Sequence, residues 1–170
     1  MRVSIVLPAK NEVASIGRLV EELCAHYPDY EVLVVDDGSS DGTGEAAEAA
    51  GARVVRQPYS KGNGAAIKRG AQAATGDVIV FMDGDGQHAP ADVERLLYKI
   101  EEGYDLVVGA RSGLESQAGI ARWGANGFYN YLASWMVGQR IDDLTSGFRA
   151  VNRRKFLSFL YLLPNGFSYP

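Results

Sequence analysis

The sequence has little of what an extracellular or membrane-spanning protein needs. Its single cysteine, Cys24, cannot form an internal disulfide, so we expect a small core residue and a reducing compartment. The longest apolar stretch, residues 156–163, has eight residues, whereas a membrane span needs about 20. The five-residue apolar run before Pro8 is shorter than the roughly 7 to 15 residues of a signal-peptide core. These absences predict a cytoplasmic protein, with room only for peripheral contact at the cytoplasmic face of a membrane.

An excess of positive charge is also missing. The net charge is -4, which argues against nucleic acid as a partner but leaves room for a local basic site. The hydrophobic and charged fractions, 46% and 22%, are ordinary for globular proteins and exclude disordered and fibrous classes. A chain of 170 residues can form one good core, so we expect residues 1–170 to be a single domain.

Short apolar runs alternate with helical patterns over the first 110 residues. The helices are expected from Ala14 and at 44–51, 61–76 and 89–103, with Gly51 and Gly76 ending two of them. Pro8 is expected to end the first strand. This alternation predicts an α/β fold with a mostly parallel sheet and helices on both faces. The expected strands are 3–7, 31–35, 52–57, 77–82 and 105–110.

The pattern changes after residue 110. Residues 111–119 are typical of a loop, 119–137 of a long helix with several aromatic residues, and 147–152 of a strand. The aromatic residues favour helix packing over a lipid groove, although they also suit a membrane boundary. The chain then begins a helix and stops on a loop, so we expect it to be truncated at its carboxyl terminus.

Polar clusters follow three of the expected strands. "AKNE" follows the first strand, "DDGS" the second and "DGDGQH" the fourth. The carboxyl ends of parallel strands share one edge of a sheet, where ligands of such folds bind. The sequence therefore predicts a site at this edge.

Asp83 and Asp85 are two residues apart after a buried run. In an extended chain both side chains point the same way and can hold one divalent cation. Oxygen ligands favour Mg²⁺ or Mn²⁺, which completes its shell with phosphates and water. Gly84 and Gly86 would let a diphosphate approach the backbone. The alternative is a tight acidic turn with solvated carboxylates.

Two other patterns suggest different ligands. Residues 37–48 have the ligand spacing of a calcium-binding EF-hand, but a strand precedes them where that motif has a helix. "GNGAAI", residues 62–67, begins like a dinucleotide fingerprint, but Ile67 stands in place of its third glycine. A glycine-rich helix start packed close to the sheet is the simpler interpretation.

Six segments, taken in order along the chain, resemble the motifs of a known family. They are "VSIVLPAKNE", "VVDDGSSDGT", "KGNGAAIKRGAQAATGD", "FMDGDGQH", "VVGAR" and "DDLTSGFRAVNR". Together they resemble the family 2 glycosyltransferases of GT-A fold, in the branch of dolichyl-phosphate mannose synthase and bacterial polyprenyl-phosphate sugar transferases. The resemblance runs from residue 3 to about residue 154. It implies a nucleotide-binding part at about 1–110 and an acceptor part at about 111–170.

The resemblance also implies roles for individual residues of a donor site. The nucleotide pocket would be lined by Pro8, Lys10 and Glu12, and Val35 and Asp37 would hold the base or ribose. Asp83, Gly84 and Asp85 match the Asp-x-Asp motif that holds the metal, with Gln87 as a further ligand. Arg111 would lie near the phosphates. The donor would be a GDP- or UDP-hexose, with mannose or glucose as the sugar.

The expected reaction is one inverting displacement onto a polyprenyl phosphate, such as dolichyl or undecaprenyl phosphate. An arginine binds phosphate bidentately, and Arg111, Arg122 and Arg149 are the candidates for the acceptor. Arg149 would otherwise form an ion pair with Asp142 or Asp143. Asp143 would act as a general base if the acceptor were a saccharide hydroxyl. A non-catalytic nucleotide- or calcium-binding module is the remaining alternative.

Overall fold

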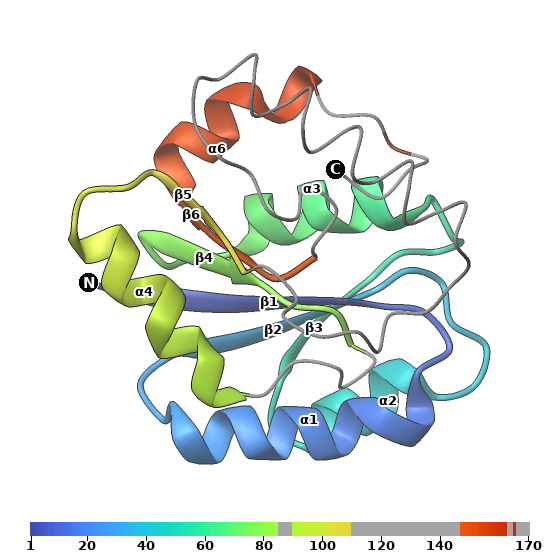
Figure 1. Ribbon diagram of the computed structural model, residues 1–170. Coiled ribbons are helices and arrows are strands. Elements are labelled where there is room, and N and C mark those ends of the chain that lie inside the picture. Colours follow the sequence, from blue (N-terminus) through green and yellow to red (C-terminus); the bar gives the residue numbers. More distant parts are fainter. Residues whose placement is uncertain (85–89, 110–146, 163–164, 166–170) are drawn as a thin grey trace, which may run out of the picture.

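A six-stranded sheet forms the centre of the molecule. The structure is a computed structural model, which describes residues 1–84, 90–109, 147–162 and 165. The strand order is β3-β2-β1-β4-β6-β5, in which β6 is antiparallel to both neighbours and the other pairs are parallel (Figure 1). The expected mostly parallel sheet is confirmed. The strands are β1 Val3–Ala9, β2 Glu31–Asp36, β3 Arg53–Arg56, β4 Val78–Phe81, β5 Leu106–Val108 and β6 Arg149–Asn152.

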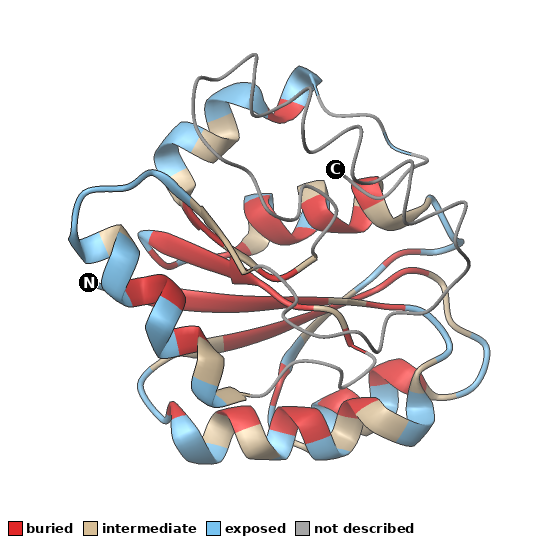
Figure 2. Ribbon diagram, viewed as in Figure 1, coloured by how far each residue is buried: buried red, intermediate tan, exposed pale blue. Residues whose placement is uncertain are grey.

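Helices cover both faces of this sheet, as expected. One face carries α1, α2 and α4, and the other carries α3 and α6 (Figure 1). Successive residues of β1 alternate between the two cores, with Ile5 and Leu7 in one and Val6 in the other. Figure 2 shows the buried residues in the central strands and on the inner sides of the helices. The helices are α1 Val13–His26, α2 Thr43–Ala49, α3 Asn63–Ala73, α4 Val93–Glu101 and α6 Arg153–Phe159, with 3-10 turns at Pro90–Asp92 and Leu160–Leu162.

Several expected boundaries were off by two or more residues, and two of them have a physical explanation in the structure. β1 continues through Pro8 to Ala9, because Pro8 lies beyond the last β4 pairing, which is Val6 with Phe81. A strand tolerates proline where no ladder partner needs its N–H group.

The other wrong boundary is the end of α3, which stops at Ala73 rather than at Gly76. Gly76 instead approaches β1 closely: its N–H group donates to the Ser4 hydroxyl at 2.8 Å, and a Cβ there would lie 2.7 Å from the Ser4 nitrogen. The glycine therefore marks a close packing contact and not a helix end.

A polar cluster ties the amino ends of the strands together. The Glu31 carboxylate accepts hydrogen bonds from the hydroxyl of Ser4, the N–H group and hydroxyl of Thr75, and the guanidinium of Arg53. Burial raises the pKa of Glu31, but these hydrogen bonds outweigh burial and the pKa lies below its usual value. The cluster lies at the edge of the sheet opposite the expected site.

Several expectations concern residues outside those described. The long helix at 119–137 and its aromatic residues are among them, as are the last residues of the chain. Among the helices that the structure describes, none combines the length and the apolar character needed to cross a bilayer.

Candidate functional site

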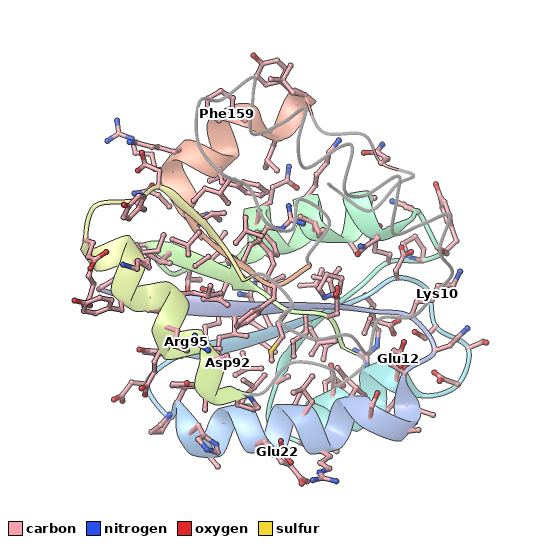
Figure 3. All side chains as sticks on the ribbon, viewed as in Figure 1. Lys10, Glu12, Glu22, Asp92, Arg95 and Phe159 are labelled. Atoms are coloured by element: carbon pink, nitrogen blue, oxygen red, sulfur yellow. The ribbon has the colours of Figure 1, made fainter. Side chains whose placement is uncertain are left out.

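A pocket of about 340 Å³ opens at the carboxyl end of β1. It collects residues from the ends of β1, β2 and β4 and from the start of α3. Figure 3 shows the side chains of Lys10 and Glu12 at this end of the sheet. Six of the residues expected to bind the donor lie together here. The lining residues are Pro8, Ala9, Lys10, Glu12, Asp37, Ser60, Gly62, Asn63, Ala66, Asp83 and Gly84.

The loops after β1 and β2 are cross-linked next to the pocket. Asn11 has a positive φ of 55°, its N–H group donates to the Ser39 hydroxyl at 3.0 Å, and its side-chain oxygen accepts from the Ser40 N–H group at 3.0 Å. The Glu12 N–H group donates to the Thr43 hydroxyl at 2.8 Å. These bonds hold the "AKNE" and "DDGS" clusters side by side, as the strand-end argument predicted.

Asp37 fastens a third loop to the pocket. Its carboxylate accepts hydrogen bonds from the Gln57 amide at 3.0 Å, the Ser60 hydroxyl at 2.7 Å, and the N–H groups of Lys61 and Gly62 at 2.8 and 3.0 Å. A carboxylate has about four acceptor positions, and loop residues 57–62 occupy those that were expected to bind the nucleotide base. Asp37 thus lines the pocket as part of its wall, and it is only 4% exposed.

Gly38 lets that loop come so close. A Cβ at Gly38 would lie 2.6 Å from the backbone of Tyr59 and Ser60, and its φ of +69° also disfavours other residues. The "DDGS" segment therefore needs glycine here for packing.

Val35 does not reach the pocket. The expectation that it holds the base or ribose is wrong for its side chain, which is fully buried. It packs in the core beside Val6, Leu33 and Ala66 under α3. Side chains alternate along β2, so Val35 points to the face that α3 covers and its neighbour Asp36 points to the other face.

Asp83 and Gly84 form the floor of the pocket near β6. The strand β4 ends at Phe81 and Gly84 lies in a turn, so the assumption of an extended chain through Gly84 was wrong. A Cβ at Gly147 would lie 2.3 to 2.6 Å from the Asp83 carboxylate atoms, so this glycine lets the start of the "SGFR" segment contact the carboxylate. Asp85 and Gln87 lie outside the described residues.

The oxygen donors at this end of the sheet fit a hard divalent cation. The Asp83 carboxylate occupies the space that a side chain at position 147 would fill, and it lines an open pocket. Among the described residues no cluster of three carboxylate, histidine or cysteine side chains is complete. A cation here would therefore draw on Asp83 together with Asp85 and Gln87 and on the phosphates of a ligand.

Known proteins share the sequence pattern of this chain. The family model described as "Glycosyl transferase family 2" matches residues 4–159. The chain belongs to glycosyl transferase family 2. Family 2 relatives include the undecaprenyl-phosphate 4-deoxy-4-formamido-L-arabinose transferase of Klebsiella pneumoniae (strain 342), 36% identical over 89% of this chain and 49% of the relative. The dolichol-phosphate mannosyltransferase of Pyrococcus furiosus is 33% identical over 98% of this chain and 50% of the relative.

Solved structures agree with the family 2 assignment and the GT-A fold. Mannosyl-3-phosphoglycerate synthase from Rubrobacter xylanophilus has a TM-score of 0.77 at 24% identity, over 92% of this chain and 54% of that chain, which shows a shared fold. Glucosyl-3-phosphoglycerate synthase from Mycobacterium tuberculosis, solved with Mn²⁺, UDP-glucose and phosphoglyceric acid, has a TM-score of 0.74 at 30% identity, over 90% and 57% of the two chains. The chain spans about half the length of the curated relatives it matches.

Arg149 is the first residue of β6 and is not among the residues that line the pocket. Because β6 is antiparallel, its first residue pairs with Phe81, the last residue of β4, at the pocket end of the sheet. Arg149 lies on the same face as Val151, which packs in the core under α3. Its expected alternative partners, Asp142 and Asp143, lie outside the described residues, as do Arg111 and Arg122.

The calcium interpretation of residues 37–48 was wrong in this family 2 chain. Asp37 binds loop 57–62, Asp41 accepts from the Thr43 hydroxyl at 2.6 Å, and Glu48 pairs with Arg56 at 2.6 Å. The three carboxylates thus serve separate partners. Hydrogen bonds lower the pKa of both Asp41 and Glu48, from Thr43 in one case and from Arg56 in the other.

Sequence reasoning missed five lining residues of the pocket: Ala9, Ser60, Gly62, Asn63 and Ala66, of which the last three lie within residues 62–67. The signal was "GNGAAI", which was interpreted only as the start of a helix packed against the sheet. That packing exists: Ala66 and Ile67 are buried in the core under α3, and farther along the helix a Cβ at Gly70 would lie 2.4 Å from Val6 Cγ1. The start of α3, which follows Gly62 at φ 95°, forms the pocket wall as well.

Proposed function

We propose that this protein is a metal-dependent, inverting glycosyltransferase that moves a hexose from a nucleotide-sugar to a polyprenyl phosphate. The observation that carries this function is the single pocket that brings Asp83 and Gly84 together with Glu12 and Lys10 at the carboxyl end of the sheet. The names of the relatives supply the acceptor class, since two of them are undecaprenyl- and dolichol-phosphate transferases. A lipid acceptor would make the protein act at a membrane surface.

The pocket suits a nucleoside diphosphate. The start of α3 forms one wall, and the amino end of a helix favours a phosphate through its dipole and its N–H groups. Lys10 adds a positive charge at the opposite wall, and Glu12 offers a carboxylate for ribose hydroxyls. These groups accept either GDP or UDP, so mannose and glucose are both retained as the transferred sugar.

The chemistry requires stabilising the diphosphate as it leaves. A divalent cation, Mg²⁺ or Mn²⁺, supplies Lewis-acid stabilisation when bound. Asp83 would hold it with Asp85 and Gln87, and the lack of a side chain at Gly147 lets the Asp83 carboxylate keep its place beside the pocket. A structure of the M. tuberculosis relative that contains Mn²⁺ and a UDP-sugar supports this assignment.

An acceptor phosphate is already anionic, so the protein has to orient it more than deprotonate it. Arg149 begins β6 at the pocket end of the sheet, where its guanidinium can bind a phosphate bidentately. Arg111 and Arg122 are the further candidates from the sequence. Attack opposite the leaving diphosphate would invert the anomeric carbon.

A second acceptor class also has support. The M. tuberculosis relative was solved with phosphoglyceric acid, which offers a hydroxyl rather than a phosphate as nucleophile. Transfer to a hydroxyl, of a saccharide or a small acid, would need a general base, for which Asp143 is the sequence candidate. The donor half of the site would be the same.

Radiolabelled donor transfer tests the proposal. GDP-mannose and UDP-glucose would each be offered with undecaprenyl phosphate, an oligosaccharide or phosphoglycerate, with MnCl₂ or with EDTA. We expect label in the lipid fraction only with metal, and loss of transfer in Asp85→Ala while Asp29→Ala, an exposed control, stays active. Label in the hydroxyl acceptors would favour the second class. Metal-independent transfer or an active Asp85→Ala variant would overturn the proposal.

A further inference from the structure

One hydroxyl lies between the two acidic segments of the pocket. Ser15, in the first turn of α1, has its Oγ atom 3.1 Å from the Gly84 carbonyl oxygen, and 3.3 Å from both the backbone oxygen and Oε2 of Glu12. Glu12 and Gly84 both line the pocket and come from different segments, the loop after β1 and the turn after β4. Gly84 directly follows Asp83, so Ser15 connects the nucleotide side to the side expected to bind metal.

A serine hydroxyl has one proton to donate, and its three neighbours here are all acceptors. An ionised carboxylate and a carbonyl oxygen offer no proton in return. Ser15 can therefore make one strong hydrogen bond at a time, to Glu12 or to Gly84. These bonds are alternatives, and when the Glu12 carboxylate is engaged elsewhere the shorter of the two remaining contacts is the one to Gly84, at 3.1 Å against 3.3 Å to the Glu12 backbone oxygen.

Gly84 is held tightly in other directions, so this bond affects its position. A Cβ on Gly84 would lie 3.3 Å from the Pro8 carbonyl oxygen and 3.5 Å from Ile16 Cδ1. The Gly84 peptide thus packs between the end of β1 and the first turn of α1. A hydrogen bond from Ser15 to its carbonyl fixes the peptide group that follows Gly84.

We propose that Ser15 is a positioning residue that couples nucleotide binding to metal binding, an inference that rests on the proposed function. A nucleotide whose ribose engages Glu12 commits the Ser15 proton to the Gly84 carbonyl. The fixed Gly84 peptide then holds the metal-binding segment in place. Coupling of this kind is reciprocal, so the metal strengthens nucleotide binding by the same factor.

Calorimetric titration of the full chain with UDP and with GDP, each with and without MnCl₂, measures this coupling. The coupling factor is the ratio of the nucleotide Kd without metal to the Kd with metal. We expect Ser15→Ala to lower this factor by about three- to tenfold, the worth of one neutral hydrogen bond. The nucleotide Kd without metal should stay the same or fall, because the Ser15 hydroxyl no longer occupies the Glu12 carboxylate. Alanine favours helix, so the variant should fold.

Two further variants make the test specific to the hydroxyl. Ser15→Thr keeps a hydroxyl and should keep the coupling. The matched control is Ser158→Ala, because Ser158 lies in α6 and also donates to the carbonyl three residues earlier, that of Lys155. This variant should leave both Kd values and the coupling factor unchanged. Equal weakening of both Kd values, unchanged coupling in Ser15→Ala, or loss of coupling in Ser15→Thr would overturn the inference. A wild-type chain that binds neither nucleotide would instead refute the proposed function.

Discussion

The Asp37 carboxylate offers the sharpest test of how the pocket is built. We consider Asp37→Asn, which keeps the size of the side chain and exchanges one acceptor oxygen for an NH₂ group. The carboxylate is 4% exposed and accepts four hydrogen bonds from loop 57–62. The better orientation puts the NH₂ group toward Ser60 and Gly62, because the Ser60 hydroxyl can turn and accept while a backbone N–H group cannot.

The expected loss follows from those contacts. The Gly62 N–H group is left facing another donor, which costs about 1 to 3 kcal/mol. The bonds from Gln57 and Lys61 change from charge-assisted to neutral, which weakens each by about 1 kcal/mol. The free energy of unfolding should therefore fall by about 3 to 5 kcal/mol, a large share of the roughly 5 to 15 kcal/mol of a typical domain.

Urea denaturation of the whole chain measures this, with the m-value as a check that the same structure unfolds. The control is Asp29→Asn, since Asp29 is exposed in the turn after α1 and its change should stay within about 0.5 kcal/mol. Amide exchange at Lys61 and Gly62 detects the loop detaching by itself. A loss below about 1 kcal/mol with unchanged exchange at both amides would refute the reasoning.

Three further predictions follow from the packing. Glu31 has a pKa below the ordinary 4.5 in the folded protein. Its ionised carboxylate therefore contributes fully to the free energy of unfolding above pH 4.5, and this contribution is lost as the pH falls through the folded pKa. In Glu31→Gln, the stability measured by urea denaturation should depend less on pH in this acid range. Gly147→Ala displaces the Asp83 carboxylate and should weaken metal-dependent nucleotide binding about tenfold or more by calorimetry, whereas Gly17→Ala, with its nearest atom at 3.8 Å, should not. Tyr27→Phe removes a 2.9 Å bond to the Pro90 carbonyl and should cost about 1 kcal/mol of stability in thermal unfolding.

The architecture was predictable because its signals are local. Buried strands such as 31–35 are short β-branched runs, and the turns after them carry the polar residues of the site. Their shared edge follows from parallel pairing, which is why Glu12, Asp37 and Asp83 could be expected together. The position of each strand in the sheet is not local, and the insertion of β6 between β4 and β5 has no signature in periodicity.

Side-chain roles were harder to predict because they depend on contacts distant in sequence. Val35 and Asp37 are two positions apart, yet Val35 packs in the core and Asp37 lines the pocket, because β2 ends between them at Asp36. The saturation of Asp37 depends on a loop some twenty positions later. Gly147 looked like part of a strand motif, and only the fold shows that it makes room for the Asp83 carboxylate.

The antiparallel strand β6 has a consequence for how the chain folds. It pairs with both β4 and β5, and Val78 lies opposite Asn152. The sheet therefore cannot be completed until residues 149–152, near the end of the chain, are available to pair. During synthesis β4 would emerge with one edge open until residues 149–152 follow, and distant pairings of this kind slow folding. Fragments that stop before β6 would expose that edge to other chains and should aggregate. Residues 149–152 and the strands of the first 108 residues are therefore joined in one shared sheet.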